Sequence, residues 1–408
     1  MSLCRYLPTP SDRMAVMWTL LSIKDAVVLE YGPSGTTHYS LGLFSSMGLE
    51  PNNSLFTTHI SEDDVIMGDV TRLEKSIVEV DESYYPKVIF VVGSSITAVI
   101  GTDLIGICRY MEERVSARLI PLDEGGFRGD YTVGLRKVYS FIMQELPKVN
   151  ASEHSDYNIL GASAGSYRIR SDIRELEDMM FRAYGMTPGV VPGLYASVED
   201  IEKMGGAKIN LVLRAEALPA AEHLRDAFGT PFVYGSPYGY TRSLEWIEQI
   251  GTALEIKANK DFLADLNRSL HKVHKIKMHT MMGAKKPKAT FIGDYDLLTG
   301  LESFCEELGI QITNLICSHS LKGLDCHSDK IRYYIDEKDR LDIIKGLNKE
   351  LVLADDVSLH VLPQDNTGLC VSFPFLNTTE AATQPPLMGI NGANTLMETF
   401  YSYLDTLR

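Results

Sequence analysis

An apolar run that ends in a glycine turn and leads into an amphipathic helix is the feature that most constrains the fold of this chain. Its first occurrence is Ala26–Leu29, followed by Tyr31–His38 (YGPSGTTH) and then by apolar residues at helical spacing. The pattern recurs, with further strand-like runs at Val88–Val92, Tyr157–Leu160, Lys208–Leu213, Lys288–Ile292 and Ile312–Cys317. Because strands that alternate with helices pair in parallel, the sequence predicts an α/β fold with parallel sheets.

Breaks in this pattern divide the chain into three segments, and we predict domains at 1–150, 151–284 and 285–408. The segments 97–113 and 258–282 each read as one helix, the second of them charged and rich in Met. Further strands are predicted at 117–121 and 232–234. Glycine-bearing loops follow these two and the strands 26–29 and 88–92, at 32–38, 93–96, 125–129 and 235–240. Loops at the carboxyl ends of parallel strands converge on a crevice, so we predict that these four line one pocket.

Charge and composition narrow the class of protein. The 408 residues include 54 acidic and 39 basic side chains, and the net charge of −15 argues against binding to nucleic acid or to a membrane. The chain starts without an apolar signal region, and its longest uncharged apolar stretch, 88–102, is too short and too polar for a membrane span. Six cysteines without a Cys-x-x-Cys pair are typical of reduced thiols in the cytoplasm. There is no Walker A loop, so we expect no nucleotide to be bound by this chain.

Several segments resemble, in order, the nitrogenase component 1 family. The loop 31–38 is similar to the family's His-Gly-Pro-x-Gly-Cys turn, and 125–129 (GGFRG) is similar to its Gly-Phe-x-Gly loop. Other segments that resemble the family are 92–95 with 100–103, 157–161, 207–212, 235–241, 291–294 with 307–309, and 386–393. The resemblance covers most of the chain and implies three Rossmann-like, doubly wound parallel-sheet domains around a central cleft.

The departures from this family are equally informative. Family members hold an iron–sulfur cluster at a subunit interface through cysteines. The resemblance implies that the corresponding positions of this chain are Cys4, Thr36 and Ser95. Hydroxyl groups are poor ligands for such clusters. Where nitrogenase anchors its active-site cofactor through another Cys, this chain has Leu213-Arg214. The resemblance therefore implies an iron–sulfur cluster shared with a partner chain through Cys4, and a substrate other than dinitrogen.

Three functions follow from these observations. The first is a subunit of a nitrogenase-like oxidoreductase, which pairs with a related component 1 subunit and receives low-potential electrons from an ATP-dependent iron–sulfur reductase. The second is a non-redox scaffold or carrier that binds a metal cofactor or a tetrapyrrole in the same cleft. The third is a solute-binding-type protein, which the absence of a signal sequence opposes.

The strand-end loops supply the candidate cofactor-binding residues. Helix N-termini present free N–H groups there, and glycine lets the backbone approach a ligand. The candidates are Gly32, Ser34, Gly35, Thr36, Ser95, Gly126 and Arg128. Arg128 would contact an anion, or it would lie on the surface. The alternative for the first loop is a plain turn, with Thr36 or Thr37 capping the following helix.

Two further groups have both a functional and a structural interpretation. The densest set of soft ligands offers the donors of a tetrahedral zinc site and consists of Cys317, His319, Cys326 and His327. Its spacing matches no common zinc motif, so the alternative is a buried Cys317 with the other residues on a loop. The basic run 272–288 is either a solvated helix face or a docking surface for an acidic partner.

Overall fold

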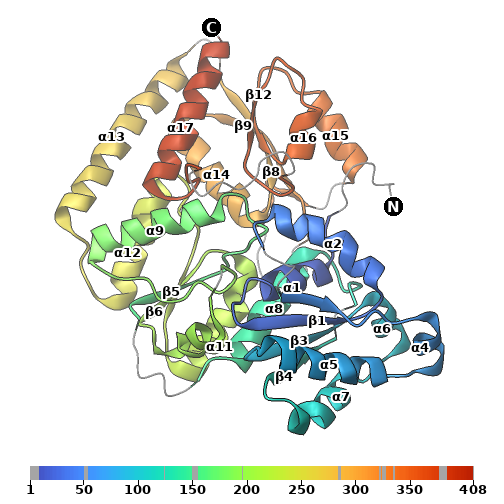
Figure 1. Ribbon diagram of the computed structural model, residues 1–408. Coiled ribbons are helices and arrows are strands. Elements are labelled where there is room, and N and C mark those ends of the chain that lie inside the picture. The colour runs from blue at the N-terminus through green and yellow to red at the C-terminus, as the bar shows by residue number, and fades with distance from the viewer. Residues whose placement is uncertain are drawn as a thin grey trace.

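The computed structural model of the protein describes residues 9–49, 54–123, 125–148, 155–194, 196–283, 286–320, 323, 328–333, 336–375 and 384–407. Three parallel sheets lie within these ranges (Figure 1). The first has the order β2-β1-β3-β4, with strands at Leu55–Thr57, Ala26–Tyr31, Val88–Gly93 and Arg118–Leu122. The second has the order β5-β6-β7, at Tyr157–Leu160, Ile209–Val212 and Phe232–Tyr234. The third has the order β10-β9-β8-β11-β12, at Arg332–Tyr333, Gln311–Cys317, Lys288–Gly293, Leu351–Ala354 and Thr367–Cys370.

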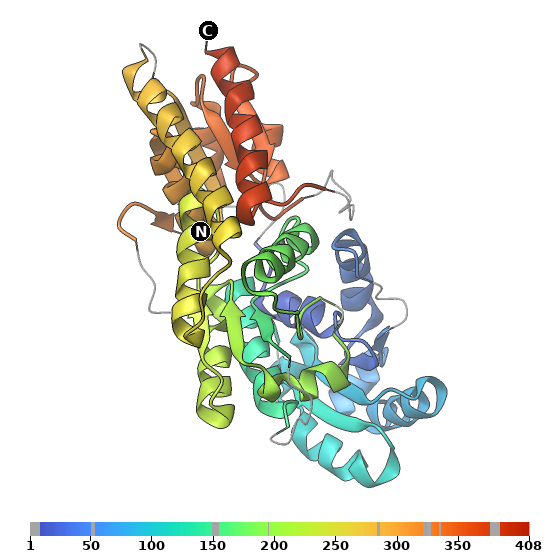
Figure 2. The same cartoon turned by 90° about the vertical axis from the view of Figure 1, so that its left-hand side faces the viewer.

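Helices connect the strands and cover the sheets (Figures 1 and 2). Around the first sheet they are α1, α2 and α4 to α8, at Asp12–Leu20, Ser34–Ser46, Glu62–Met67, Thr71–Tyr84, Ser95–Ile100, Leu104–Met111 and Tyr131–Glu145. Helices α9 to α13 follow at Ile169–Tyr184, Val198–Glu202, Leu218–Phe228, Gly239–Leu254 and Lys260–Met282. Helices α14 to α17 lie at Tyr295–Leu308, Glu337–Lys345, Asp356–His360 and Gly389–Thr406. The predicted α/β fold with parallel sheets is confirmed.

The strands are apolar on both faces because helices pack on each side of a parallel sheet. In the first sheet Val28 and Phe90 face one core cluster, and Leu29 faces another on the opposite side. The first cluster continues through Leu211 of the second sheet and Phe291 of the third. One apolar core therefore joins the three sheets, and this core fixes where the loops at their carboxyl ends lie.

One element differs from the sequence expectation. The apolar pattern predicts a single helix over 97–113, but the structure has two, α6 and α7, separated at Gly101. Gly101 has a φ of +71°, a left-handed conformation that commonly ends a helix. Asp103 then caps α7 by accepting a hydrogen bond from the N–H of Gly106 at 2.9 Å. Apolar residues continue at helical spacing across this break, so the pattern does not reveal it.

The segment 258–282 does form one helix, α13 (Lys260–Met282). Each sheet lies within one of the three predicted segments, while the domain boundaries themselves stay a prediction. Among the helices that the structure describes, none combines the length and the apolarity that crossing a bilayer requires.

Candidate functional site

Three of the four predicted loops lie together at the carboxyl end of the first sheet. A Cβ on Gly32 would lie 2.5 Å from the Cβ of Ser94, so the close approach of these two loops requires glycine. The hydroxyl of Ser95 donates to the carbonyl oxygen of Gly125 at 2.6 Å. The loops 32–38, 93–96 and 125–129 therefore form one group. All seven candidates lie in it, namely Gly32, Ser34, Gly35, Thr36, Ser95, Gly126 and Arg128.

A buried ion pair beneath the loops holds them in place. Glu30 in β1 accepts a hydrogen bond from the Thr37 hydroxyl at 2.6 Å and pairs with Arg13 at 2.5 Å. Arg13 also donates to the carbonyl oxygen of Gly93 at 3.3 Å, so one guanidinium connects β1 to the end of β3. Helix α2 begins after Pro33 without a side-chain cap, and Thr37 bonds back to β1 instead. The expected capping of this helix by Thr37 is therefore wrong.

The described part of this loop group does not fit an iron–sulfur cluster. Such a cluster needs thiolates, whereas the three loops contain no cysteine, and the hydroxyl of Ser95 already bonds to Gly125. The described cysteines lie in helices and strands outside these loops, at 108, 305, 317 and 370. Cys4 and the side chain of Thr36 lie outside what the structure describes. A cluster at this face would take its ligands from Cys4 or from another chain.

Arg128 lies at the outer surface of the loop group. Its backbone N–H donates to the carboxylate of Asp12 at 3.3 Å, and its side chain is exposed. The neighbouring Phe127 is 71% exposed. Gly126 has a φ of +84°, which other residues adopt only with strain. This turn directs Phe127 and Arg128 outward, away from the interior of the molecule.

The fourth loop, 235–240, lines a different space. Ser236 and Tyr238 belong to the wall of a cavity of about 30 Å³ between the second and third sheets. A second cavity, of about 10 Å³, lies next to it beside Trp18 and Tyr131. None of the residues of the other three loops lines either cavity. The structure thus divides the single predicted pocket into an outer loop group and an inner pair of cavities.

The inner cavities have room for water and for little else. A buried water needs about 10 to 15 Å³ of such space, whereas pockets for small molecules usually measure about 300 Å³ or more. In the part of the chain that the structure describes, neither of these two cavities therefore has room for a tetrapyrrole or a metal cofactor.

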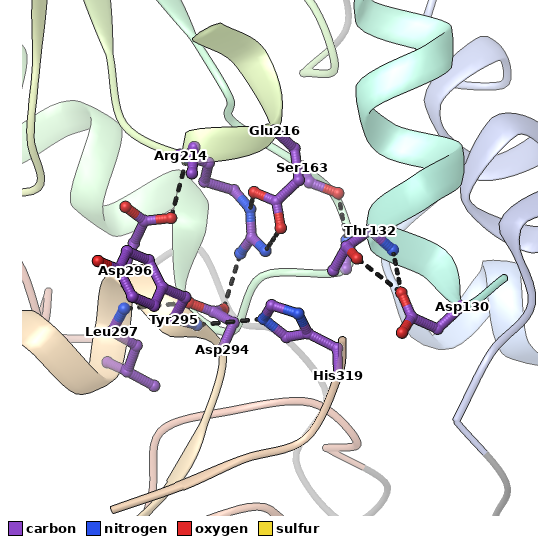
Figure 3. Close-up of polar contacts among 12 residues, drawn as sticks. Asp130, Thr132, Ser163, Arg214, Glu216, Asp294, Tyr295, Asp296, Leu297 and His319 are labelled. Carbon is purple, nitrogen blue, oxygen red and sulfur yellow. Dashed lines mark hydrogen bonds and ion pairs between the residues drawn. The ribbon is translucent and has the colours of Figure 1, made fainter. Parts of the chain in front are cut away.

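Arg214 lines both cavities. Figure 3 shows its guanidinium between Glu216 and Asp294. Its guanidinium donates two hydrogen bonds to Glu216, each 3.1 Å long, and one of 2.7 Å to Asp294. Burial alone would lower the pKa of Arg214, but the carboxylates of Asp294 and Glu216 raise it well above its ordinary value. Burial would raise the pKa of Asp294, and the guanidinium outweighs this and keeps it below its usual range. The second and third sheets are thus joined by a permanently charged, buried network.

Two more buried carboxyl groups line the larger cavity. Asp296 accepts a hydrogen bond from the hydroxyl of Tyr234 at 2.6 Å, and burial raises its pKa. Asp172 accepts the N–H groups of Leu387 and Met388 at 2.6 and 2.8 Å, and burial raises its pKa to about 7. Burial therefore favours the neutral, protonated form of both carboxyl groups, whereas the neighbouring guanidinium of Arg214 stays charged.

Both ring nitrogens of His319 bond to backbone groups of its own segment, and Figure 3 shows the contact with Tyr295. Its Nε2 accepts the N–H of Tyr295 at 3.1 Å, which assigns the ring proton to Nδ1, 3.0 Å from the carbonyl oxygen of Ser320. The N–H of Ser320 donates to Asp130, the residue before α8, at 2.8 Å and so connects this region to the first sheet's helices. With both nitrogens engaged, His319 would have to break a hydrogen bond to bind a metal ion.

The other residues of the proposed zinc group give it no further support. Cys317 is buried at the end of β9, and burial raises the pKa of its thiol, which disfavours the thiolate that zinc binds. Cys326 and His327 lie outside the described residues. Within the described part of the chain, no three His, Cys, Asp or Glu side chains are arranged to hold a metal ion.

Sequence reasoning missed the carboxylates of this network. Arg214 is recognisable as an Arg that follows a strand, but its partners Glu216 and Asp294 were not singled out. Both follow strand ends closely, so the rule that sites form at the carboxyl ends of parallel strands would have pointed to them. Asp294 is easy to overlook because it also caps α14, where an Asp is ordinary.

Comparison with known proteins identifies the family to which this chain belongs. The family model described as "Nitrogenase component 1 type Oxidoreductase" matches residues 11–405, and the chain belongs to that family. It is 26% identical to the "Nitrogenase iron-molybdenum cofactor biosynthesis protein NifE" of Nostoc sp. (strain PCC 7120), over 95% of this chain and 82% of the relative. It is 23% identical to a subunit of the light-independent protochlorophyllide reductase of Chlorobium phaeobacteroides, over 93% of this chain and 76% of the relative.

A solved structure shares the fold. The structure titled "Nitrogenase Cp1 at pH 6.5" superposes with a TM-score of 0.80 at 17% identity and covers 100% of this chain and 95% of the other. At this identity the likeness concerns the fold alone. The resemblance inferred from the sequence segments is confirmed.

Proposed function

We propose that this chain is one subunit of a nitrogenase-like oxidoreductase complex, in which a related chain provides the cluster thiolates and the substrate site. The observation that carries this proposal is the buried Arg214 network, which occupies the space between the domains and leaves cavities of about 30 and 10 Å³. Because these two cavities are too small for a substrate, we place the substrate site in the related chain and give this chain a supporting role in the complex. In this proposal an ATP-dependent iron–sulfur reductase supplies low-potential electrons to the complex, and the substrate is one other than dinitrogen.

An exposed apolar patch beside the loop group suits the contact with the related subunit. Phe127 and Val99 are 71% and 73% exposed, and Ile96 is 38% exposed. A Cβ on Gly125 would lie 2.5 Å from Ala98 and 3.2 Å from the ring of Phe127, so the loop and α6 form one surface. Neighbouring apolar side chains on a surface commonly mark an interface. A subunit seated here would also lie next to the loops at which a shared cluster would have to be held.

Co-expression with a related component 1 chain from the same genome tests the proposal. We expect anaerobic purification through a tag on this chain to yield a complex that contains iron and that is reduced by an iron–sulfur reductase only when ATP is present. Phe127→Glu with Val99→Glu should lower the yield of complex at least about tenfold, because a buried unpaired charge is costly at an interface. Phe181→Glu changes another exposed Phe, on α9, and should leave the yield unchanged. Equal yields from the two variants would contradict the proposed interface.

A second function is favoured by the names of the relatives. The first six relatives are called iron-molybdenum cofactor biosynthesis proteins, which suits an assembly scaffold. The purified complex distinguishes the two. A scaffold would release bound metal to an acceptor protein and would show no electron uptake that depends on ATP, whereas a reductase would show that uptake and retain its metal.

A further inference from the structure

The C-terminal half of α13 carries an exposed basic surface that the proposed function does not use. Residues 266–293 contain seven Lys and Arg side chains and no Asp or Glu, in a chain whose net charge is −15. Exposed side chains of this helix form what we call the basic face, which consists of Lys272, Lys275, Met278 and Met282. The two methionines are 49% and 79% exposed, and neither lysine has an ion-pair partner within the described residues.

Helix α4 carries a surface of opposite charge and similar layout. We call it the acidic tip, and it consists of Glu62, Asp63, Ile66 and Met67. Residues four apart lie on the same side of a helix, so each acid stands next to an apolar side chain. Ile66 and Met67 are 71% and 79% exposed, and the two acids are exposed and unpaired in the part of the chain that is described. Both surfaces thus combine unpaired charges with exposed apolar side chains.

We propose that the basic face of one molecule docks on the acidic tip of a second copy. Helices α13 and α4 lie on opposite sides of the molecule (Figure 1), so the two surfaces cannot meet within one chain. With the helices parallel, the acids of the tip oppose Lys272 and Lys275, while its apolar side chains lie against Met278 and Met282. Such a contact joins two different surfaces, and copies therefore associate head to tail.

A protein surface suits the basic face better than another polyanion does. Residues 263–290 contain no Phe, Tyr or Trp, the side chains on which bases stack best, and the rest of the chain is strongly acidic and repels nucleic acid. Exposed methionines adapt to apolar protein surfaces. Two helix faces bury less than the roughly 1,200 Å² of stable complexes, so the association should be weak and sensitive to salt.

Sedimentation velocity of the purified chain tests this contact. At about 50 mM salt the sedimentation coefficient should rise between about 1 and about 200 µM protein, and at about 500 mM salt it should stay constant. The variants Lys272→Glu/Lys275→Glu and Glu62→Lys/Asp63→Lys should each stay monomeric. An equimolar mixture of the two should associate again, because each then offers a surface opposite in charge to one on the other.

The control variant Lys338→Glu/Lys345→Glu makes the same change of net charge on exposed lysines of α15 and should associate like the wild type. A monomeric wild type at low salt, or association that survives both charge reversals, overturns the proposal. So does a gel shift in which a DNA duplex of about 20 base pairs binds through Lys272 and Lys275 while the chain stays monomeric. Neither surface includes Phe127 or Val99, so a failure here leaves the proposed subunit contact untouched.

Discussion

Arg214 occupies the space between the second and third sheets, where it pairs with two buried carboxylates. Arg214→Met would leave Glu216 and Asp294 as buried charges without a partner, so we expect the free energy of unfolding to fall by about 3 to 5 kcal/mol. Urea denaturation at neutral pH measures this change. The triple variant Arg214→Met/Glu216→Gln/Asp294→Asn should recover much of the loss, because no charge then remains unpaired. A single variant as stable as the wild type would show that the network does not stabilise the fold.

Asp172 should give stability a recognisable pH dependence. Burial raises its pKa from 3.8 to about 7, so the folded chain retains a proton that the unfolded chain loses above about pH 4. This group therefore lowers the free energy of unfolding of the wild type as the pH rises from about 4 to about 7, and it has no such effect below about pH 4. Asp172→Asn keeps an acceptor for Leu387 and Met388 but cannot ionise.

The stability of Asp172→Asn relative to the wild type should therefore rise between about pH 4 and about pH 7, by up to roughly 4 kcal/mol, and stay constant above about pH 7. Thermal unfolding across this range measures the difference between the two proteins. A difference that stays constant with pH would mean that Asp172 does not titrate in the folded state near neutrality.

Among the elements, α1 and α8 cross with their backbones in contact. A Cβ on Gly134 would lie 2.0 Å from the carbonyl oxygen of Asp12, and Gly134→Ala should force the helices apart at a cost of about 3 kcal/mol or more. Gly42 of α2 is the matched control, since nothing lies within 4 Å of its added Cβ. Gly42→Ala should be neutral or stabilise by about 0.5 to 1 kcal/mol. Equal stabilities of the two variants in urea would contradict this close crossing.

The strands and the loops that follow them differ in how far the sequence predicts them. Strands such as Val88–Val92 can be recognised from the sequence because a strand buried on both faces is apolar throughout. The grouping of the first three loops was also predictable, because all of them end strands of one sheet. The place of the fourth loop depends on how the sheets pack together, and local patterns do not encode that. For the same reason the pairing of Arg214 with Asp294, 80 residues apart, becomes visible only in the fold.

On the scale of the whole molecule, three sheets share one core, and the space between them is taken up by side chains of the chain itself. The thiols that the structure describes lie within secondary structure, and burial raises the pKa of Cys108 to about 12. Burial favours the protonated form of such thiols near neutral pH, and none of the described thiols lies in the loop group. These features support the proposal that the cluster and substrate sites of the complex depend on a second chain.

Iron determination after anaerobic reconstitution of the isolated chain with iron and sulfide tests this claim most directly. We predict well under about four irons per chain, because the described loops offer hydroxyl groups where a cluster needs thiolates. Any iron that does bind should disappear in Cys4→Ser. A stable four-iron cluster in each monomer, still present after Cys4→Ser, would contradict both the proposed ligand and the need for a second chain.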